Sequence, residues 1–368
     1  MANVSPEKER QMLALFLVPG VYLRVLAETV RKLGHDDRAL YEGLDFGPSD
    51  LRTNDSRVFV TDAIAMAERA VALAGHQGLS FLLARELRVT IHGTLGFAAL
   101  TSPTMADALE SVRRYLRLRA PFLTMTLREA ENSMLVQLKP EFSVSPLDPF
   151  LAETVSATLV MLTEQLVDRD SAAAEGCELV AGKLPGVSVQ LRAPEPAYYR
   201  DFQAQLPVRF EYGREAEMMI FPKTLLRARM RLADAEASDM AREQCEFELQ
   251  KALKEQGDIT FAIRNMLHVM PGPLPSLEAM AERFCVSSRT LKRRLADRNT
   301  TYREIVEAVL KDRAIQLLRY TNRSVSEIAY ELGYADLSNF SRAFRKWTGK
   351  SASEFREDGP DPAPELGP

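Results

Sequence analysis

The stretch "VSEIAYELGYADLSNFSRAF", residues 325–344, decides the fold of the C-terminal part of this 368-residue chain. Apolar residues recur at helical spacing on both sides of Gly333, which suits a turn with positive φ. Beyond the turn, Phe340, Phe344 and Trp347 form one apolar stripe, and serines, arginines and a lysine occupy the other faces. The pattern predicts two short helices joined by a tight turn, the second with an apolar back and a polar, basic front.

An earlier stretch repeats this pattern. In "LEAMAERFCVSSRTLKRRL", residues 277–295, Ala281 falls on Ala329 of the later copy, and alanine at both places lets two helices approach closely. After one extra residue in the later copy, Arg293 falls on Arg342. Two matched copies indicate a duplicated helix-turn-helix.

Capping signals place a long helix between the two copies. Ser324 with Glu327 forms a capping box before the first helix of the later copy, and Thr301 with Glu304 forms another. The second box opens a helix that we expect to run to about Leu318, over roughly 27 Å. This length is near the ~34 Å between successive major-groove faces on one side of DNA, so both copies are expected to reach adjacent turns of one duplex.

The front faces of the second helices supply the candidate DNA contacts. A helix-turn-helix lays its second helix in the major groove and needs polar or basic residues near the start of that helix. The candidates are Arg289, Thr290, Lys292 and Arg293 in the first copy and Ser338, Asn339, Ser341, Arg342, Arg345 and Lys346 in the second. We interpret the aromatic stripe behind them as core, not as a cofactor site.

The charge distribution agrees with a DNA-binding C-terminal part. The net charge is −4, but residues 275–357 contain 16 of the 47 Lys and Arg residues and only 11 of the 51 Asp and Glu residues. An excess of positive charge confined to one part of an acidic chain favours an anionic partner there. No apolar run reaches the roughly 18 residues of a membrane span, so we expect no membrane partner.

The first part of the chain mixes helices with a small sheet. Helical patterns end at Gly34 and Gly75, where left-handed caps are expected, and a third helix opens with Ser102 as its cap. Alternating residues on both sides of "EAENS" predict a hairpin over 122–140. Further strands are predicted within 176–182, 187–194, 207–212 and 217–222, and further helices over 148–167 and 232–256.

These patterns divide the chain into three parts. Residues 1–255 are predicted to form an α+β domain for effector sensing and dimerisation. Residues 258–356 are predicted to form an all-α domain, with two helix-turn-helix motifs joined by a long helix. The tail, residues 357–368, is rich in proline, glycine and acid, and we expect it to be disordered.

Several single residues invite functional interpretations that the sequence does not favour. His92 is a candidate ligand-binding residue, but a lone histidine is more often a satisfied structural one. Cys285 takes the place of Gly333 in the first copy, and a small residue buried in a turn explains it better than a nucleophile does. Asp148, Glu153 and Glu164 show no spacing of a catalytic pair. The three cysteines and four histidines show no metal-ligand pattern, so we expect no metal, no cofactor and no enzyme activity.

The duplicated helices resemble those of a known family. The stretches "SVSEIAYELGYADLSNFSRAFRKWTGKSASEFR" and "LEAMAERFCVSSRTLKRRLADRNTTYREIVEAVLKDRAIQLL" are similar to the DNA-binding domain of the AraC/XylS family of bacterial transcription regulators. Ala352 stands where the family usually has proline, and Asn299 stands where glycine is common, although asparagine tolerates left-handed φ. The resemblance implies base contacts from Arg289, Thr290, Arg293, Ser338, Asn339 and Arg342, and phosphate contacts or packing for Lys292, Arg294, Ser341, Arg345 and Lys346.

The N-terminal part resembles the ligand domain of one branch of that family, the ornithine-utilisation-regulator type, often labelled arabinose-binding-like. The stretches "IHGTLGFAALTSPTMADALESVRRY" and "PVRFEYGREAEMMIFPKTLLRARMRL" carry this looser resemblance. The effectors of the family vary widely, so the label does not establish arabinose as the ligand.

The sequence therefore predicts a cytoplasmic, nucleoid-associated bacterial regulator that binds promoter DNA, responds to a small-molecule effector and acts as an activator with RNA polymerase. We expect a homodimer formed through helix 148–167 or helix 232–256. Two alternatives stay open: an enzyme fused to a DNA-binding domain, and a ligand-independent architectural DNA-binding protein. The first needs a nucleophile or metal cluster within residues 1–255, and the second predicts a body without a pocket.

Overall fold

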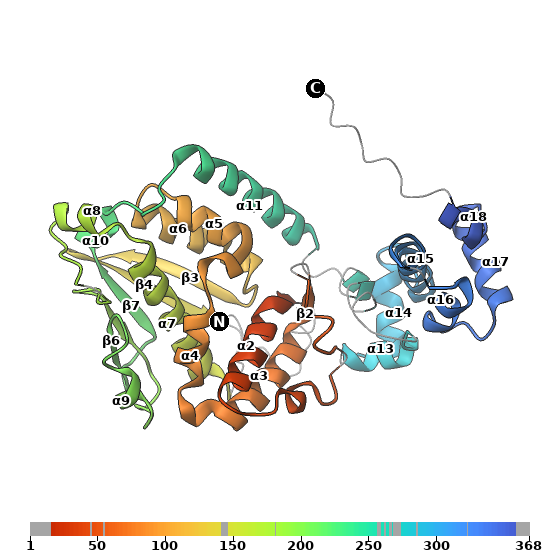
Figure 1. Cartoon of the computed structure of the whole chain (residues 1–368), viewed down its shortest axis with the longest axis horizontal. Coiled ribbons are helices and arrows are strands. Elements are labelled where there is room, and N and C mark those ends of the chain that lie inside the picture. Colours follow the sequence, from red (N-terminus) through yellow and green to blue (C-terminus); the bar gives the residue numbers. More distant parts are fainter. Residues whose placement is uncertain are drawn as a thin grey trace. The chain divides into compact units, whose positions relative to one another are not determined.

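The computed structural model describes residues 16–44, 46–53, 56–140, 146–180, 182–255, 259–260, 263–264, 267, 274–284, 286–321 and 323–357. These residues fall into two compact units, one up to residue 255 and one from residue 259 onward. The first unit mixes helices with two sheets, and the described elements of the second unit are all helices (Figure 1). The α+β and all-α fold classes predicted from the sequence are confirmed. The expected disordered tail lies outside the described residues, apart from Glu357.

A five-stranded sheet organises the N-terminal unit. Its strands are β3 (Leu123–Glu129), β4 (Ser133–Pro140), β7 (Met218–Pro222), β5 (Ser188–Gln190) and β6 (Arg209–Glu211), in that order. Only β5 and β6 run parallel. The predicted hairpin is confirmed, with β3 and β4 paired antiparallel along their length.

One predicted strand, over 176–182, does not form among its described residues. Residues 176–180 contain no strand because the chain there closes the short helix α8 (Arg169–Ala174). Gly176 has a φ of 82°, and the Cys177 N–H donates to the Ala172 carbonyl. Cys177 then packs into the core without joining the sheet.

Two helices pack against the sheet and form the larger core. They are α6 (Met105–Tyr115) and α7 (Asp148–Leu166). The sequence placed the cap of α6 at Ser102, which is wrong: the cap is Thr104, in a reciprocal capping box with Asp107. The Ser102 hydroxyl instead donates to the Ala98 carbonyl, which belongs to the preceding helix.

A second core lies among three other helices and a two-stranded sheet. The helices are α2 (Gly20–Lys32), α3 (Val60–Ala74) and α4 (Leu79–Glu86), and the strands are β1 (Leu17–Pro19) and β2 (Arg57–Phe59). Gly34 follows α2 with the expected positive φ, 88°. Gly75 does not adopt it: its φ is −58°, and the chain continues through a 3₁₀ turn (Gly75–Gln77) to Gly78, where φ is 75°.

The two helices proposed for dimerisation differ in exposure. Only Pro149 and Gln165 of α7 are exposed, because this helix lies inside the unit, so α7 offers no free apolar surface. Helix α11 (Ala235–Glu255) packs on α5 (Gly93–Thr101) and keeps two large apolar residues, Met240 and Phe247, exposed to 67% and 68%. Of the two candidates, only α11 retains a surface that a second copy can cover.

The C-terminal unit is the expected pair of helix-turn-helix motifs. The first motif is α13 (Leu277–Arg283) and α14 (Ser288–Ala296), the second is α16 (Val325–Glu331) and α17 (Leu337–Thr348), and α15 (Tyr302–Tyr320) connects them before the final α18 (Ala352–Glu357). Both predicted capping boxes are present, at the starts of α15 and α16. Gly333 has a φ of 84° and Asn299 a φ of 54°, as their places in the turns require. Cys285 lies outside the described residues.

Candidate nucleic-acid interface and ligand cavity

Helix α14 carries its predicted contact residues on one exposed side. Leu291 and Leu295 are buried beneath it, so the opposite side faces solvent. Arg289, Lys292 and Arg293 are all exposed there. Thr290 is only partly exposed and helps to close the start of the helix: its N–H donates to the Ser287 hydroxyl, and the two hydroxyls are 2.9 Å apart. Three basic side chains are therefore available on the front of α14, whereas Thr290 is partly committed to the cap.

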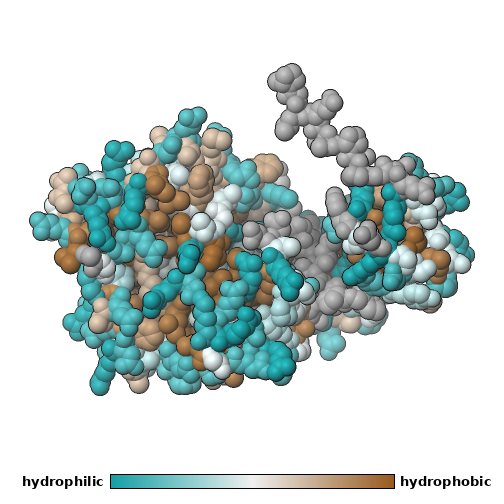
Figure 2. Space-filling model, in the orientation of Figure 1, coloured by the Kyte–Doolittle hydropathy of each residue, from teal (hydrophilic) through white to brown (hydrophobic). Residues whose placement is uncertain are grey.

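Helix α17 has the same arrangement over a larger apolar back. Phe340 and Phe344 are fully buried, and Phe340 packs edge-on against Tyr334 at 5.5 Å between ring centroids. Burial of one such phenyl group stabilises the fold by about 1.5–3 kcal/mol. Ser338, Asn339, Arg342, Arg345 and Lys346 are exposed on the other sides, and Ser341 is partly exposed. Hydrophilic side chains also cover much of the visible surface of this unit (Figure 2).

The front of α17 is held by its own hydrogen bonds. Asp336 caps the helix by accepting from the Asn339 N–H at 2.7 Å, and its second oxygen accepts from Asn339 Nδ2 at 2.6 Å. Arg342 Nη2 in turn donates to Asn339 Oδ1 at 2.6 Å. The two best candidates for base contact on this helix are thus bonded to each other, and a bound base would have to replace or extend these bonds.

One predicted phosphate contact is paired with an acid. The Lys346 ammonium lies 3.2 Å from a Glu307 oxygen of α15, and Arg303 Nε lies 3.1 Å from the other oxygen. Lys346 and Arg303 together hold the pKa of Glu307 below its usual range. A phosphate that approaches Lys346 therefore competes with a carboxylate for the ammonium group.

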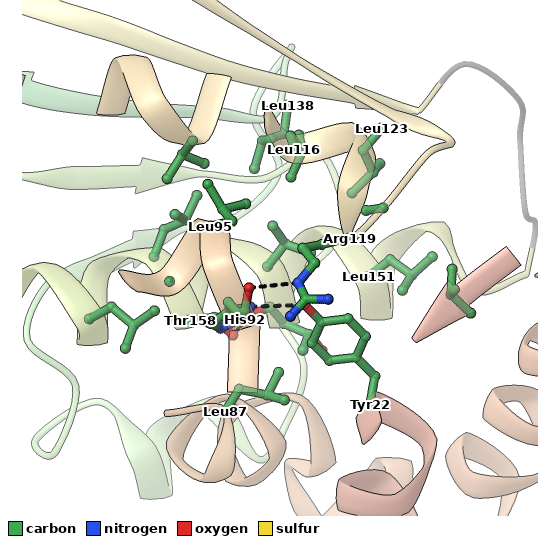
Figure 3. A pocket seen from close by; sticks show the side chains of 18 of the residues that line it. Tyr22, Leu87, His92, Leu95, Leu116, Arg119, Leu123, Leu138, Leu151 and Thr158 are labelled. Carbon is green, nitrogen blue, oxygen red and sulfur yellow. Dashed lines mark hydrogen bonds between the residues drawn. The ribbon is translucent and has the colours of Figure 1, made fainter. Parts of the chain in front are cut away.

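The N-terminal unit contains a cavity of about 280 Å³ between its two cores. Helices α2 to α7, strands β3 and β4 and the loops between them contribute to its wall. Figure 3 shows leucine side chains from several of these elements, with Tyr22, His92 and Arg119 meeting in the middle of the view. The wall includes no Asp, Glu or Lys among the described residues, and its polar or ionisable side chains are Tyr22, His92, Arg119, Thr154, Thr158 and Thr163.

A small polar cluster interrupts this apolar wall. The Tyr22 hydroxyl lies 3.0 Å from His92 Nδ1, and Arg119 Nε donates to the His92 carbonyl at 2.6 Å. Burial raises the pKa of Tyr22 to about 12. Burial and the nearby Arg119 guanidinium lower the pKa of His92 to about 4, against a smaller opposite effect of the Leu87 carbonyl. At neutral pH, His92 is therefore uncharged, and Arg119 is the one charged side chain that the described residues contribute to the wall.

Two polar atoms of the wall are buried without a hydrogen-bond partner among the described residues: His92 Nε2 and Thr154 Oγ1. The hydroxyls of Thr158 and Thr163 are not available in the same way, because each donates to a backbone carbonyl four residues earlier in α7. A buried polar group without a partner costs about 1–3 kcal/mol, so a bound molecule that reaches either atom gains a hydrogen bond there.

The sequence predicted little of this cavity. It named His92 but favoured a satisfied structural histidine, and the structure instead leaves Nε2 without a partner among the residues it describes. Tyr22 and Arg119 were not named, because a tyrosine on an amphipathic helix and an arginine in a basic stretch carry no separate signal. Only the fold brings Tyr22, His92 and Arg119 together from three distant parts of the chain.

The acidic residues considered as a catalytic pair have other roles. Asp148 stands in the first turn of α7. Glu153 is buried on the same helix and accepts hydrogen bonds from Ser80, Tyr212 and Tyr198, the last at 2.7 Å. Glu164 pairs with Arg169 at 2.7 Å.

Two further properties bear on the kind of protein. Within the described part of the chain, no group of three His, Cys, Asp or Glu side chains is placed to hold a metal ion. In that same part, none of the helices is both long and apolar enough to cross a membrane.

Both units match known protein families. Residues 34–230 match the family described as "Arabinose-binding domain of AraC transcription regulator, N-term". Residues 280–358 match the family described as "Helix-turn-helix domain". The ornithine utilization regulator of Pseudomonas aeruginosa is 31% identical to this chain over 341 residues, which cover 93% of this chain and 96% of that protein.

Two further relatives come from the same organism. The transcriptional regulator VqsM is 28% identical over 290 residues, which cover 77% of this chain and 84% of that protein. The crystal structure of the transcriptional regulator CdpR aligns with a TM-score of 0.41 at 25% identity, and the alignment covers 80% of this chain and 91% of that one.

Proposed function

This chain belongs to the AraC family of DNA-binding transcription regulators, and we propose that it is an effector-responsive activator that reads promoter DNA with two recognition helices. The observation that carries the proposal is the pair of exposed, polar fronts on α14 and α17, each backed by buried apolar residues and joined by α15. The 19 residues of α15 give it a length of about 28 Å, near the ~34 Å repeat of the major groove. The two fronts then read adjacent turns of one duplex.

The residue types suggest how the contacts divide. Arg293 on α14 and Arg342 on α17 suit bidentate contacts with guanine, and Asn339 suits adenine. Arg289, Thr290 and Ser338 stand beside them as further base contacts. Lys292, Arg294, Ser341, Arg345 and Lys346 serve phosphate contact or packing, which fixes the register of the module without reading sequence.

The N-terminal unit acts as the sensor in this proposal. An effector bound in the cavity changes transcription only to the extent that it favours one of two arrangements of the regulator. Homodimerisation is assigned to α11, because Met240 and Phe247 stay exposed while its other side packs on α5. RNA polymerase is the partner through which activation takes effect.

A genome-wide occupancy map tests the proposal. We expect wild type to occupy a few sharp sites upstream of genes, each with two base clusters about 10 bp apart. The double variant Arg293→Ala/Arg342→Ala should lose these sites, because each arginine contributes about 1–3 kcal/mol to the specific contact. The matched control is Arg113→Ala/Arg200→Ala, which removes the same charge from exposed residues of the N-terminal unit and should leave the map unchanged. Broad occupancy that is equal in all three proteins contradicts the proposal.

A further inference from the structure

We propose that the effector is an amphipathic carboxylate, whose apolar body fills the cavity of the N-terminal unit and whose carboxylate binds the Arg119 guanidinium. The inference rests on the proposed effector response and assigns its chemical class. It follows from the size of the cavity, the charges in its wall, and the geometry of Arg119.

The size of the cavity limits the apolar body. An apolar cavity of about 150 Å³ holds benzene, with about six non-hydrogen atoms. In proportion, the cavity of about 280 Å³ holds about eleven. Because nearly all of its wall is aliphatic or aromatic carbon, most of these atoms have to be carbon for the fit to be favourable.

The charges of the wall determine the sign of the head group. The described residues place no Asp or Glu in the wall, so an ammonium group would enter without a counter-ion and would face the positive charge of Arg119. A polyhydroxylated sugar would bury several hydroxyls against leucine and valine. An anion instead meets the one charged side chain described in the wall, and an ion that is buried with a partner avoids the high cost of burial alone.

Arg119 is held in position to receive this anion. Nε and Nη2 of Arg119 donate to the carbonyls of His92 and Ile91, at 2.6 and 3.3 Å, which fixes the plane of the guanidinium. Among the described residues, Nη1 has no hydrogen-bond partner and no carboxylate pairs with Arg119. Gly93 allows this approach, since a Cβ at that position would collide with Arg119 Nη2. An arginine fixed by backbone carbonyls, with a free donor and no counter-ion, is suited to bind a carboxylate.

Nearby polar atoms complete the head-group end of the cavity. The Tyr22 hydroxyl and His92 Nε2 belong to the same cluster as Arg119, and Nε2 is buried without a partner in the described part of the chain. A hydroxyl of the ligand, or a water that bridges to the ligand, would give His92 Nε2 a hydrogen-bond partner.

Calorimetric titration of the full-length protein with four probes tests the inference. The probes are octanoate, octanamide, ornithine and arabinose. Octanoate has about ten non-hydrogen atoms, close to the capacity estimated for the cavity. Octanamide has nearly the same shape without the charge, so it should bind about ten- to hundredfold more weakly than octanoate. This comparison needs no variant and does not depend on how a substitution affects folding.

Three variants locate the binding site. Arg119→Met should weaken octanoate binding about ten- to hundredfold and leave octanamide binding nearly unchanged. Ala63→Phe, which fills the cavity from α3, should abolish binding of both. Arg113→Met is the matched control, because Arg113 lies exposed on α6 and pairs with Glu110 away from the cavity wall, and it should bind octanoate like wild type.

The outcomes separate this inference from the proposed function. Tighter binding of ornithine or arabinose than of octanoate, or equal binding of octanoate and octanamide, overturns the assignment of a carboxylate. If no probe binds while the same preparation protects promoter DNA at discrete sites, the ligand class is wrong and the regulator proposal stands. If octanoate binds through Arg119 but no promoter segment is protected, the ligand class stands and the regulator proposal fails.

Discussion

Helices α14 and α17 occupy equivalent places in the two motifs, but the charged side chains on their exposed faces differ in how they are paired. On α14, Arg289, Lys292 and Arg293 are exposed and bonded to no other side chain among the described residues. On α17, Arg342 donates to Asn339, and Lys346 pairs with Glu307. A DNA molecule that meets α14 finds three charges that are unpaired within the described part of the chain, and one that meets α17 finds two of its charged side chains, Arg342 and Lys346, already paired.

This difference suggests a division of work. A contact that replaces an existing hydrogen bond gains less free energy than a contact made from a solvated side chain. We therefore expect α14 to supply the larger part of the affinity. We expect α17 to be the more selective helix, because an incorrect base leaves the bonds among Asp336, Asn339 and Arg342 intact. Substitutions in the two motifs test this division between α14 and α17, and their expected effects differ in size.

Truncating the buried apolar residues behind α14 and α17 should have the largest effect, which is a loss of local stability. Phe344→Ala should cost about 3–5 kcal/mol of local stability and Leu295→Ala about 2–5 kcal/mol, because each empties a fully buried position. Hydrogen exchange of the full-length protein should show fast exchange over α16–α18 for Phe344→Ala and over α13–α14 for Leu295→Ala. Equal exchange across both motifs in either variant would show that the motifs do not have separate cores.

Removing Arg293 or Arg342 should weaken specific DNA binding by different amounts. Arg293→Ala should cost close to the upper end of about 1–3 kcal/mol of specific binding, and Arg342→Ala should cost close to the lower end. The reason is that a base competes with Asn339, on the same helix, for the Arg342 guanidinium. Competition titrations on one promoter fragment measure both values. A larger loss for Arg342→Ala would reverse the proposed division.

The two lysines should show the same order as the two arginines, with the larger effect on α14, whatever the DNA sequence. Lys292→Ala should lower the slope of log affinity against log salt by about 0.9, the value for one lost phosphate contact. Lys346→Ala should lower this slope by less, because Lys346 is already paired with Glu307. Titrations over a range of salt concentrations, on specific and random DNA, give these slopes. A loss confined to one sequence would contradict a phosphate role for either lysine.

Removing the acid that pairs with Lys346 should have the smallest effect on DNA affinity. Glu307→Gln removes the acid that pairs with Lys346 and Arg303, and should tighten binding about two- to fivefold on specific and random DNA alike. Glu278→Gln is the matched control, since it removes an exposed acid of α13 and leaves the pairing of Lys346 with Glu307 in place. Equal tightening by both variants would mean that net charge, not the release of Lys346, is responsible.

The C-terminal fold was largely predictable from the sequence, because its signals are local. A capping box needs only residues such as Thr301 and Glu304, three apart, and a turn glycine such as Gly333 needs only its neighbours. The ion pair of Lys346 with Glu307 was not predictable, since it joins residues 39 apart through the packing of α17 on α15.

The N-terminal unit was predictable only in part. The hairpin of β3 and β4 is local and was correctly predicted, but residues 176–180 of the strand expected at 176–182 form no strand, because Gly176 and Cys177 close a helix instead. The cavity was not predictable, because Tyr22, His92 and Arg119 come from segments far apart in the chain and meet only through the tertiary fold. Periodicity identifies which face of a helix is buried, but it does not distinguish a face that lines a cavity from one that is packed in a core.

The most direct test of the two-reader hypothesis is a base-by-base substitution scan of one promoter site, measured with wild type, Arg293→Ala and Arg342→Ala. Wild type should show two clusters of sensitive bases about 10 bp apart. Arg293→Ala should relax base choice in one cluster only, and Arg342→Ala in the other only. If both variants relax the same cluster, or neither relaxes any base, then α14 and α17 are not the two reading helices of this regulator.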